Sequence, residues 1–412
     1  MSPTRKSRQS QIPPPGEGGK FTLVEDQPTF DRFVAQLRRQ RRFALDLEAD
    51  SFHHYQEKIC LIQVSFSGQT FLVDTLSGIN LGALARVFGD PRCEKVLHGA
   101  DYDGRLIISH MGVRLRNFFD TMLGAQILGK PQVGLAALVS EYFQVTLDKR
   151  YQRADWSRRP LEPAQMEYAA KDVQYLLALR DALGEELEKM GRINWALEEF
   201  ELLEAGFEAL PGRRQEVIRI KGDRALDARQ AAVLQSLLRW REGVARKKDV
   251  PPFKVIPNDM LLRLARVEGQ DRDGLLEALT PRLRALYGDE IRRAWEKGRR
   301  SSPLELPREG GGGMRISRGA EKRLQRLKEW RSHFAHDLQM DPGVMLPNNT
   351  MEAVAMANPR DLADLVGRGL LKRWQLQLFG EAVLQILHTV PRGNGTAERG
   401  RQASPGSPPP AP

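Results

Sequence analysis

Runs of apolar and polar residues divide the first half of the chain into short strand-like segments followed by helix-like ones. Residues 42–48 and 59–66 are apolar or β-branched, and residues 70–74 continue as a third run of this kind. The polar stretch 50–57 separates the first two runs, and a short Ser-Gly-Gln turn separates the last two. This pattern predicts a meander of paired strands.

Helical patterns follow the meander, with short strand-like pieces at 95–97 and near Phe118. Strands interspersed with helices in this way are most economically explained by a mixed α/β domain. We therefore expect an α/β domain over residues 21–205. The sequence ALPGRR after Phe207 breaks the pattern, and a linker is expected at 206–226.

From residue 227 onward the chain shows helical patterns only. Apolar residues recur at helical spacing, and a second helix is expected after a Pro257-Asn258-Asp259 stop-and-cap signal. The segment IPNDMLLRLA in this block corresponds to LPNNTMEAVA further on. This internal repeat predicts two similar all-helical domains, 227–303 and 319–390, joined by a Gly-rich linker at 304–318. The basic leader 1–20 and the tail 391–412 are predicted from composition to be disordered.

Composition limits the class of protein before any motif is considered. Apolar residues make up 41% of the 412 residues and charged residues 28%, which is ordinary for a globular chain of more than one domain. No apolar run is long enough to cross a membrane, and Cys60 and Cys93 cannot form a disulfide framework. These features favour a cytoplasmic protein. The net charge of +10 favours a polyanionic partner.

Three motifs in the α/β domain carry carboxylates at positions that could converge. Asp46 and Glu48 lie two apart at a strand end, so their side chains would share a face of the sheet. Asp103 follows the strand-like VLHGA segment, close to the start of a helix. Tyr168 and Asp172 are four apart within a helix-forming run, 163–179, which places them on one helix face.

Each motif taken alone also has an ordinary structural interpretation. A strand running out into solvent explains Asp46 and Glu48, and a carboxylate favoured by the helix dipole explains Asp103. Tyr168 and Asp172 could equally lie on any surface helix. Asp101 is expected to cap the helix that carries Asp103. The conjunction of all three motifs, in this order, is what favours a catalytic site.

With these three motifs in this order, the sequence resembles the DEDD 3′–5′ exonuclease superfamily and, within it, bacterial ribonuclease D. Asp46 and Glu48 match the first exonuclease motif, Asp103 the second, and Tyr168 with Asp172 the third. Further matching segments are ICLIQ at 59–63, FDT at 119–121 and DWSRRPL at 155–161. Residue 167 is glutamate where another branch has a histidine base, so Tyr168 assigns the tyrosine branch. The helical repeats resemble HRDC domains.

The resemblance implies a ribonuclease H-like fold, in which helices flank a mixed sheet, and a two-metal exonuclease. Asp46, Glu48, Asp103 and Asp172 would hold two divalent ions, Mg²⁺ or Mn²⁺, and Tyr168 would orient the attacking water. Hard cations of this kind prefer the oxygen ligands that carboxylates provide. The implied reaction is removal of nucleoside 5′-monophosphates from RNA with a free 3′ end, with tRNA precursors as the expected substrate. The family also implies a monomer.

Two alternatives remain open at this point: a DNA exonuclease of the proofreading or helicase-associated type, and a non-catalytic nucleic-acid-binding module. No GxxxxGK[ST] phosphate loop is present, which favours a stand-alone enzyme. Basic clusters at 246–248, 292–293 and 297–300 are suited to backbone phosphates, although such clusters are more often solvated helix faces. The resemblance of the helical domains to HRDC domains, which are accessory nucleic-acid-binding or protein-binding units, implies that they grip the substrate.

Overall fold

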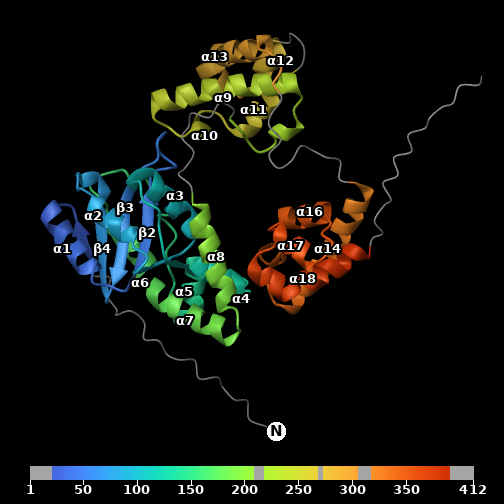
Figure 1. Cartoon of the computed structure of the whole chain (residues 1–412). Coiled ribbons are helices and arrows are strands. Elements are labelled where there is room, and N and C mark those ends of the chain that lie inside the picture. Colours follow the sequence, from blue (N-terminus) through green and yellow to red (C-terminus); the bar gives the residue numbers. More distant parts are fainter. Residues whose placement is uncertain (1–20, 208–217, 268–271, 305–316, 390–412) are drawn as a thin grey trace, which may run out of the picture. The chain divides into compact units, whose positions relative to one another are not determined.

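The computed structural model describes residues 21–207, 218–267, 272–304 and 317–389 (Figure 1). We call residues 21–207 the α/β domain, 218–304 the first helical module and 317–389 the second helical module. The chain divides into two compact units, and the α/β domain and the first helical module belong to one of them. The predicted leader, the tail, residues 208–217 of the first predicted linker and most of the second lie outside the described residues.

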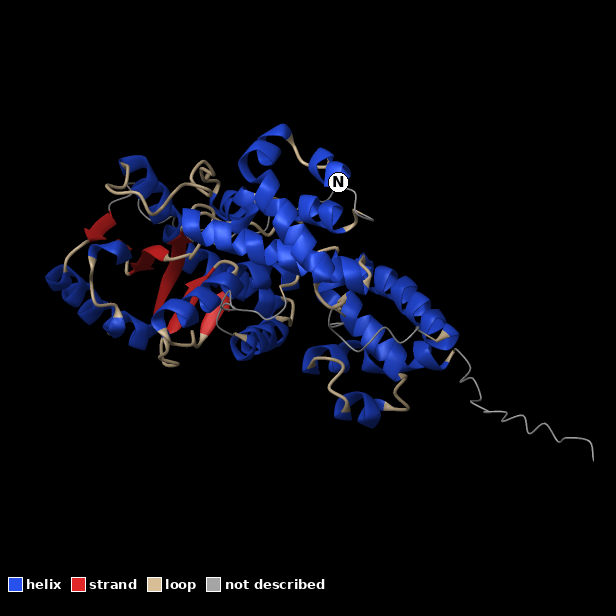
Figure 2. Ribbon diagram, turned by 90° about the horizontal axis from the view of Figure 1, so that it is seen from above, coloured by secondary structure: helices blue, strands red, loops and turns tan. Residues whose placement is uncertain are grey.

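A single mixed sheet organises the α/β domain, and Figure 2 shows that the strands of the described chain gather there. The strand order is β1-β4-β3-β2-β5-β6. Neighbours β2, β3 and β4 are antiparallel, which confirms the predicted meander, whereas β1, β5 and β6 pair in parallel with their neighbours. The strands are β1 (Phe21–Val24), β2 (Arg42–Ala49), β3 (Ile59–Phe66), β4 (Gln69–Asp74), β5 (Glu94–Leu97) and β6 (Phe118–Asp120).

Local sequence explains how the meander turns. Ser67 and Gly68 connect β3 to β4 with φ angles of 49° and 76°, so both central residues of this two-residue turn are left-handed. Such a turn twists with the strands it joins, and glycine adopts it without a Cβ clash. Every residue of β3 is buried, as expected for a central strand covered on both faces.

Helices cover both faces of this sheet. On one face Phe33 of α1 stacks against Phe66 and Phe71, and Phe88 of α2 stacks against Phe43. On the other face α6 packs against β2, β3 and β4, and α7 packs against β5. The helices are α1 (Gln27–Leu37), α2 (Gly82–Phe88), α3 (Ala100–Met111), α4 (Thr121–Leu128), α5 (Leu135–Phe143), α6 (Pro163–Gln174), α7 (Leu176–Lys189) and α8 (Ile193–Gly206). This confirms the predicted fold class of a mixed sheet flanked by helices.

One helix expectation was wrong in its extent. The run 163–179 was predicted as one helix, but α6 ends at Gln174 and α7 begins at Leu176. The intervening Tyr175, with φ −95° and ψ −13°, caps both helices. The break lets α6 lie across the strands of the meander while α7 packs against β5, α4 and α5. Tyr168 and Asp172 both remain on α6.

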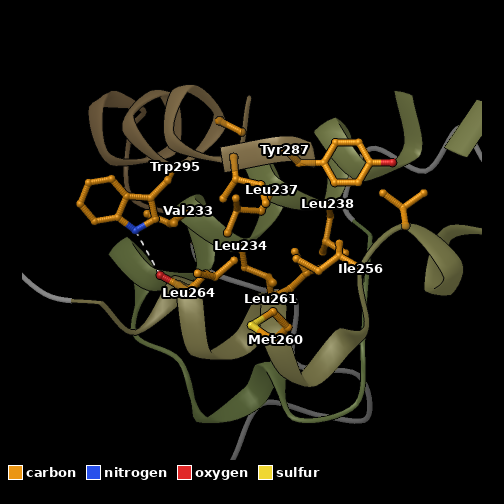
Figure 3. Close-up of a cluster of buried hydrophobic side chains, with 14 of the residues drawn as sticks. Val233, Leu234, Leu237, Leu238, Ile256, Met260, Leu261, Leu264, Tyr287 and Trp295 are labelled. Atoms are coloured by element: carbon orange, nitrogen blue, oxygen red, sulfur yellow. Dashed lines mark hydrogen bonds between the residues drawn. The ribbon is translucent and has the colours of Figure 1, made fainter. Parts of the chain in front are cut away.

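The two helical modules repeat the same order of a long helix, three short helices and a long helix. In the first module Asp227 caps α9 through a capping box with Gln230. Leu234, Leu237 and Leu261 are fully buried in its core, where the Trp295 indole donates a hydrogen bond of 3.1 Å to the Leu264 carbonyl (Figure 3). The helices are α9 (Ala228–Lys248), α10 (Pro252–Val255), α11 (Asn258–Ala265), α12 (Arg272–Glu277), α13 (Pro281–Arg300), α14 (Arg318–Asp337), α15 (Pro342–Met345), α16 (Asn348–Ala357), α17 (Leu362–Gly367) and α18 (Arg373–His388).

The predicted repeat segments occupy equivalent places, since IPNDMLLRLA forms α11 and LPNNTMEAVA forms α16. Trp295 and Trp374 are 2% and 1% exposed, so both serve the module cores and cannot stack bases. None of the helices in the described ranges is both long and apolar enough to span a membrane.

Candidate active site

Strand β2 presents Asp46 and Glu48 on the face of the sheet that α6 covers. The pleat sends Leu45 and Leu47 to the opposite face, where both are buried. Ala44, on the same face as the two carboxylates, packs with Val173 of α6. At the end of β2 the register shifts, because Glu48 lies opposite Leu61 and Ala49 lies opposite Ile59. The bulge ends the regular pairing immediately after the two carboxylates.

Helix α6 brings Asp172 to these strand carboxylates. Ligand oxygens of Asp46, Glu48 and Asp172 all lie within 4.8 Å of one another, and each of the three residues is partly buried. Residues that are 126 and 124 positions apart in sequence therefore meet because α6 lies across β2. One turn before Asp172 on the same helix, Tyr168 is 8% exposed and shares a side-chain hydrogen bond with it.

Asp103 comes from the first turn of α3 and is 7% exposed. Its charge and that of Asp46 repel each other, so Asp103 lies near the cluster, but it is not one of the three residues whose ligand oxygens all lie within 4.8 Å of one another. The helix begins at Gly99, whose φ of 81° lets the chain turn sharply from β5 into α3. The structure brings together the sequence-predicted residues Asp46, Glu48, Asp103, Tyr168 and Asp172.

The predicted cap at Asp101 was wrong. Gly99 occupies the N-cap position of α3 and makes no side-chain capping bond. The Asp101 side chain is 56% exposed and pairs instead with Arg105 at 2.9 Å. Its place in the first turn points it toward Arg105 one turn further along, where solvent stabilises both charges.

Crowding of carboxylates in a partly buried site shifts their protonation. Burial raises the pKa of Asp46 to about 6, and burial together with the charge on Asp46 raises the pKa of Asp172 to about 8. Burial and repulsion also hold the pKa values of Glu48 and Asp103 well above their usual range. Buried carboxylates in mutual repulsion gain stability from a bound cation, and an all-oxygen donor set suits a hard divalent ion. The residues present therefore fit a divalent metal site.

Tyr168 is held by two aromatic neighbours. Its ring centroid lies 5.9 Å from that of Tyr151 and 6.1 Å from that of Trp156. Burial and the nearby charge on Asp172 raise the pKa of Tyr168. The phenol therefore stays protonated near neutral pH and can orient a water molecule rather than take its proton. A cavity of about 80 Å³ adjoins Tyr168 and Asp172, and Arg150 and Lys171 also line it.

Asp120 is a further residue at the site, although sequence reasoning gave it no role beyond its place in FDT. Its buried carboxylate accepts hydrogen bonds from the backbone amides of Gly99 and Ala100, at 2.9 and 2.8 Å. The same carboxylate caps α4 by accepting from Met122 and Leu123. Asp120 thus fixes the start of α3, the helix that carries Asp103. An aspartate between a short strand and a helix is an N-cap signal that could have identified it.

The loop after β2 was also missed, since His53 and His54 were given no role. His54 bonds the Asp249 carboxylate at 2.7 Å and the Ser157 hydroxyl at 2.9 Å. Tyr55 is 3% exposed and belongs to the hydrophobic core of the first helical module. The predicted basic clusters are partly engaged within the protein, with Arg246 over the Tyr55 ring and Lys248 bonded to the Tyr287 hydroxyl.

Family comparisons agree with this geometry. A sequence model described as 3′–5′ exonuclease matches residues 21–188, and one described as HRDC domain matches both 230–294 and 320–387. Ribonuclease D of a Shewanella strain is 31% identical over 69% of this chain and 74% of its own length. This chain belongs to the ribonuclease D family. As a member of the ribonuclease D family it carries a 3′–5′ exonuclease domain and two HRDC domains.

Structural comparison extends the relation to the whole ribonuclease D chain. The crystal structure of Escherichia coli RNase D, described as an exoribonuclease involved in structured RNA processing, superposes with a TM-score of 0.68 at 26% identity. It covers 90% of this chain and 100% of that one. The exosome complex component 10 homolog of Caenorhabditis elegans is 33% identical over 63% of this chain, but the chain spans only 30% of its length.

Proposed function

We propose that this chain is a 3′–5′ exoribonuclease that removes nucleoside 5′-monophosphates from RNA with a free 3′ end. The observation that carries the proposal is the approach of Asp46, Glu48 and Asp172 to within 4.8 Å in a partly buried site. Carboxylates held this closely favour a bound cation over solvent, and phosphodiester hydrolysis requires positive charge at the phosphate. Membership of the ribonuclease D family supports RNA as the substrate class.

We further propose that Asp46, Glu48, Asp103 and Asp172 hold two divalent ions, Mg²⁺ or Mn²⁺. Ions bound there would neutralise phosphate charge and lower the pKa of water. Among the chain's own groups, Tyr168 would donate its phenolic hydrogen to the attacking water, while α6 keeps the ring one turn from Asp172. Tilted contacts with the rings of Tyr151 and Trp156 limit the rotation of that ring, which favours a fixed water position.

The substrate and setting are also part of the proposal. Structured RNA precursors, with tRNA expected among them, are supported by the description of the Escherichia coli neighbour. We propose residues 21–205 as the exonuclease domain and 227–303 and 319–390 as HRDC domains that grip the RNA. We also propose a monomer, as the family resemblance implies, in the cytoplasm, where the two free, buried cysteines would stay reduced.

A gel time course on 5′-labelled single-stranded RNA and matched DNA, with Mg²⁺, Mn²⁺ or EDTA, tests the activity. We expect stepwise shortening of RNA with either metal and none in EDTA. Asp46→Asn should abolish shortening but keep RNA binding. Asp101→Asn is the matched control, because Asp101 lies two residues before Asp103 yet pairs with Arg105 in solvent.

Other outcomes would redirect the proposal. Faster loss of DNA than of RNA would favour a DNA exonuclease. RNA binding without cleavage by the unaltered protein would favour a non-catalytic module. Equal loss of activity in Asp101→Asn and Asp103→Asn would contradict the assignment of Asp103.

A further inference from the structure

Phe52 and Phe253 form an aromatic pair at the protein surface. Their ring centroids are 6.4 Å apart, with the ring planes at 71°. Phe52 lies in the loop between β2 and β3 and is 47% exposed, and Phe253 lies in α10 and is 51% exposed. Large aromatic rings in water forgo the stabilisation that burial would give them. Such rings gathered at one place are a common mark of a binding surface.

Firm anchoring of the loop shows that the exposure of Phe52 is a feature of the folded state. The Asp50 carboxylate accepts a 2.6 Å hydrogen bond from the Lys58 amide, which closes the loop at its base. The Asp50 carbonyl accepts from the amides of His53 and His54. Directly after His54, Tyr55 inserts into the core of the first helical module. The backbone on both sides of Phe52 is therefore held, and its ring is kept in solvent.

Phe253 is fixed in a similar way. It follows Pro251 and Pro252 at the start of α10, and Val255 on the same short helix is buried in the core of the module. Phe253 and Lys254 are left on the exposed side. Both rings thus belong to segments whose neighbouring residues are packed.

Two exposed cationic residues lie on segments next to the pair, Arg153 beside the loop of Phe52 and Lys254 directly after Phe253. Arg153 lies beside the loop, because its backbone carbonyl is 3.1 Å from Nε2 of His53. Within the described ranges neither Arg153 nor Lys254 forms an ion pair, and both are exposed. The nearby acidic groups are already engaged, Asp249 by His54 and Asp155 by Ser157 and Arg158. Aromatic faces with unpaired cations are the combination that binds single-stranded nucleic acid.

The pair is also close to the carboxylate cluster. Phe52 follows Glu48 by four residues, so their Cα atoms can be no more than about 15 Å apart. The same loop carries Glu57, which accepts a 2.6 Å hydrogen bond from the Tyr102 hydroxyl, and Tyr102 directly precedes Asp103. An RNA strand whose 3′ end lies at the carboxylates could reach the two rings within a few nucleotides.

We infer that Phe52 and Phe253 form a stacking site for bases of single-stranded RNA upstream of the nucleotide being removed, with Arg153 and Lys254 near the backbone phosphates. This inference rests on the proposed exoribonuclease function. Stacking requires only a ring face, so the site accepts any base and suits an enzyme that removes every nucleotide in turn.

Binding is measured in the Asp46→Asn background, which keeps the RNA intact, with a fluorescent single-stranded RNA of about ten nucleotides. Phe52→Ala and Phe253→Ala should each weaken binding about tenfold. Phe52→Trp should bind at least as well as the unaltered residue. Leu286→Ala is the control, because Leu286 is 54% exposed on α13 of the same module and should leave binding unchanged.

Phe52→Leu separates stacking from simple packing between the two segments. Leucine keeps apolar bulk but has no ring face, so stacking predicts a loss close to that of Phe52→Ala. Binding by Phe52→Leu equal to that of the unaltered protein would overturn the inference. So would unchanged binding in both alanine variants, or an equal loss in Leu286→Ala.

Cleavage by the unaltered protein is measured separately from binding, so that this test stays distinct from the proposed function. If the unaltered protein cleaved no RNA of any length, the proposed function would fail, and the binding series would still report whether the rings stack on RNA.

Discussion

The carboxylate cluster of the exonuclease domain and the core of the first helical module use buried residues in opposite ways. Asp46, Glu48 and Asp172 crowd together in a partly buried site, where burial and repulsion disfavour their charged forms. Leu234 and Leu237 are fully buried among other apolar side chains, where burial stabilises the fold. One region therefore gives up stability for chemistry, and the other supplies stability.

Asp46→Asn should have the largest effect. It should lower RNA hydrolysis but raise the stability of the metal-free protein. RNA hydrolysis should fall at least about a thousandfold, because electrostatic stabilisation by ions at the site is worth several kcal/mol. The free energy of unfolding of the metal-free protein should rise by about 1 kcal/mol, because the substitution removes a charge that repels its neighbours. Urea denaturation in EDTA and the RNA time course measure the two effects.

Asp101→Asn is the control for both measurements, since the exposed ion pair of Asp101 with Arg105 contributes little to stability. A metal-free Asp46→Asn protein less stable than the unaltered one would show that Asp46 serves the fold, and the contrast between the two regions would fail.

Leu237→Ala should have the converse effect, lowering the stability of the first helical module while leaving the active site intact. Leu237 is fully buried in the module core, so its truncation leaves a cavity. The substitution should destabilise the first helical module by about 3 kcal/mol. Cleavage of a dinucleotide should persist at temperatures where the module stays folded. Tryptophan fluorescence during urea unfolding, with Trp295 and Trp240 in this module, follows the transition. An unshifted transition would contradict the assignment of this core.

The pH dependence of stability sharpens the comparison further. The folded-state pKa of Asp46, about 6, and that of Asp172, about 8, both exceed the ordinary value of 3.8. Between pH 4 and 8 the folded protein therefore retains protons that the unfolded chain has lost. Their contribution to stability is complete below pH 4 and is lost as pH rises through 6 and 8.

Mg²⁺ should reverse this loss, most strongly above pH 8, because its ligands must be deprotonated to bind. Thermal unfolding from pH 4 to 9 in EDTA and in Mg²⁺ tests both statements. The double variant Asp46→Asn with Asp172→Asn should show a flatter profile and no Mg²⁺ effect. An equal Mg²⁺ effect in that variant would place the ion elsewhere.

Much of the fold could be predicted because local sequence and tertiary structure agree. The meander followed from the apolar runs and the Ser67-Gly68 turn, and the repeated helical order followed from IPNDM and LPNNT. The division of α6 from α7 at Tyr175 could not be predicted, because the helical pattern continues through it. Packing against different strands decides where that helix ends.

At the site, residue spacing within each motif placed Asp46 with Glu48 and Tyr168 with Asp172 correctly on their elements. Spacing could not show that α6 lies across β2, and the resemblance to a family supplied that step. The roles of Asp120 and His54 depend on hydrogen bonds between residues far apart in the chain, to Gly99 and to Asp249. No local pattern records such partners.

The smallest effect should come from a helix cap in the stabilising region. Asp227 accepts hydrogen bonds of 2.8 Å from the amides of Arg229 and Gln230 at the start of α9. Asp227→Ala should cost about 1 kcal/mol of stability, because these amides lose their partner. RNA hydrolysis should not change, since Asp227 contacts none of the carboxylates. Urea denaturation measures the loss against Asp259→Ala, whose ion pair with Arg263 is exposed. A fall in hydrolysis without a fall in stability would mean that the start of α9 serves the reaction, and the two regions would no longer divide chemistry from stability.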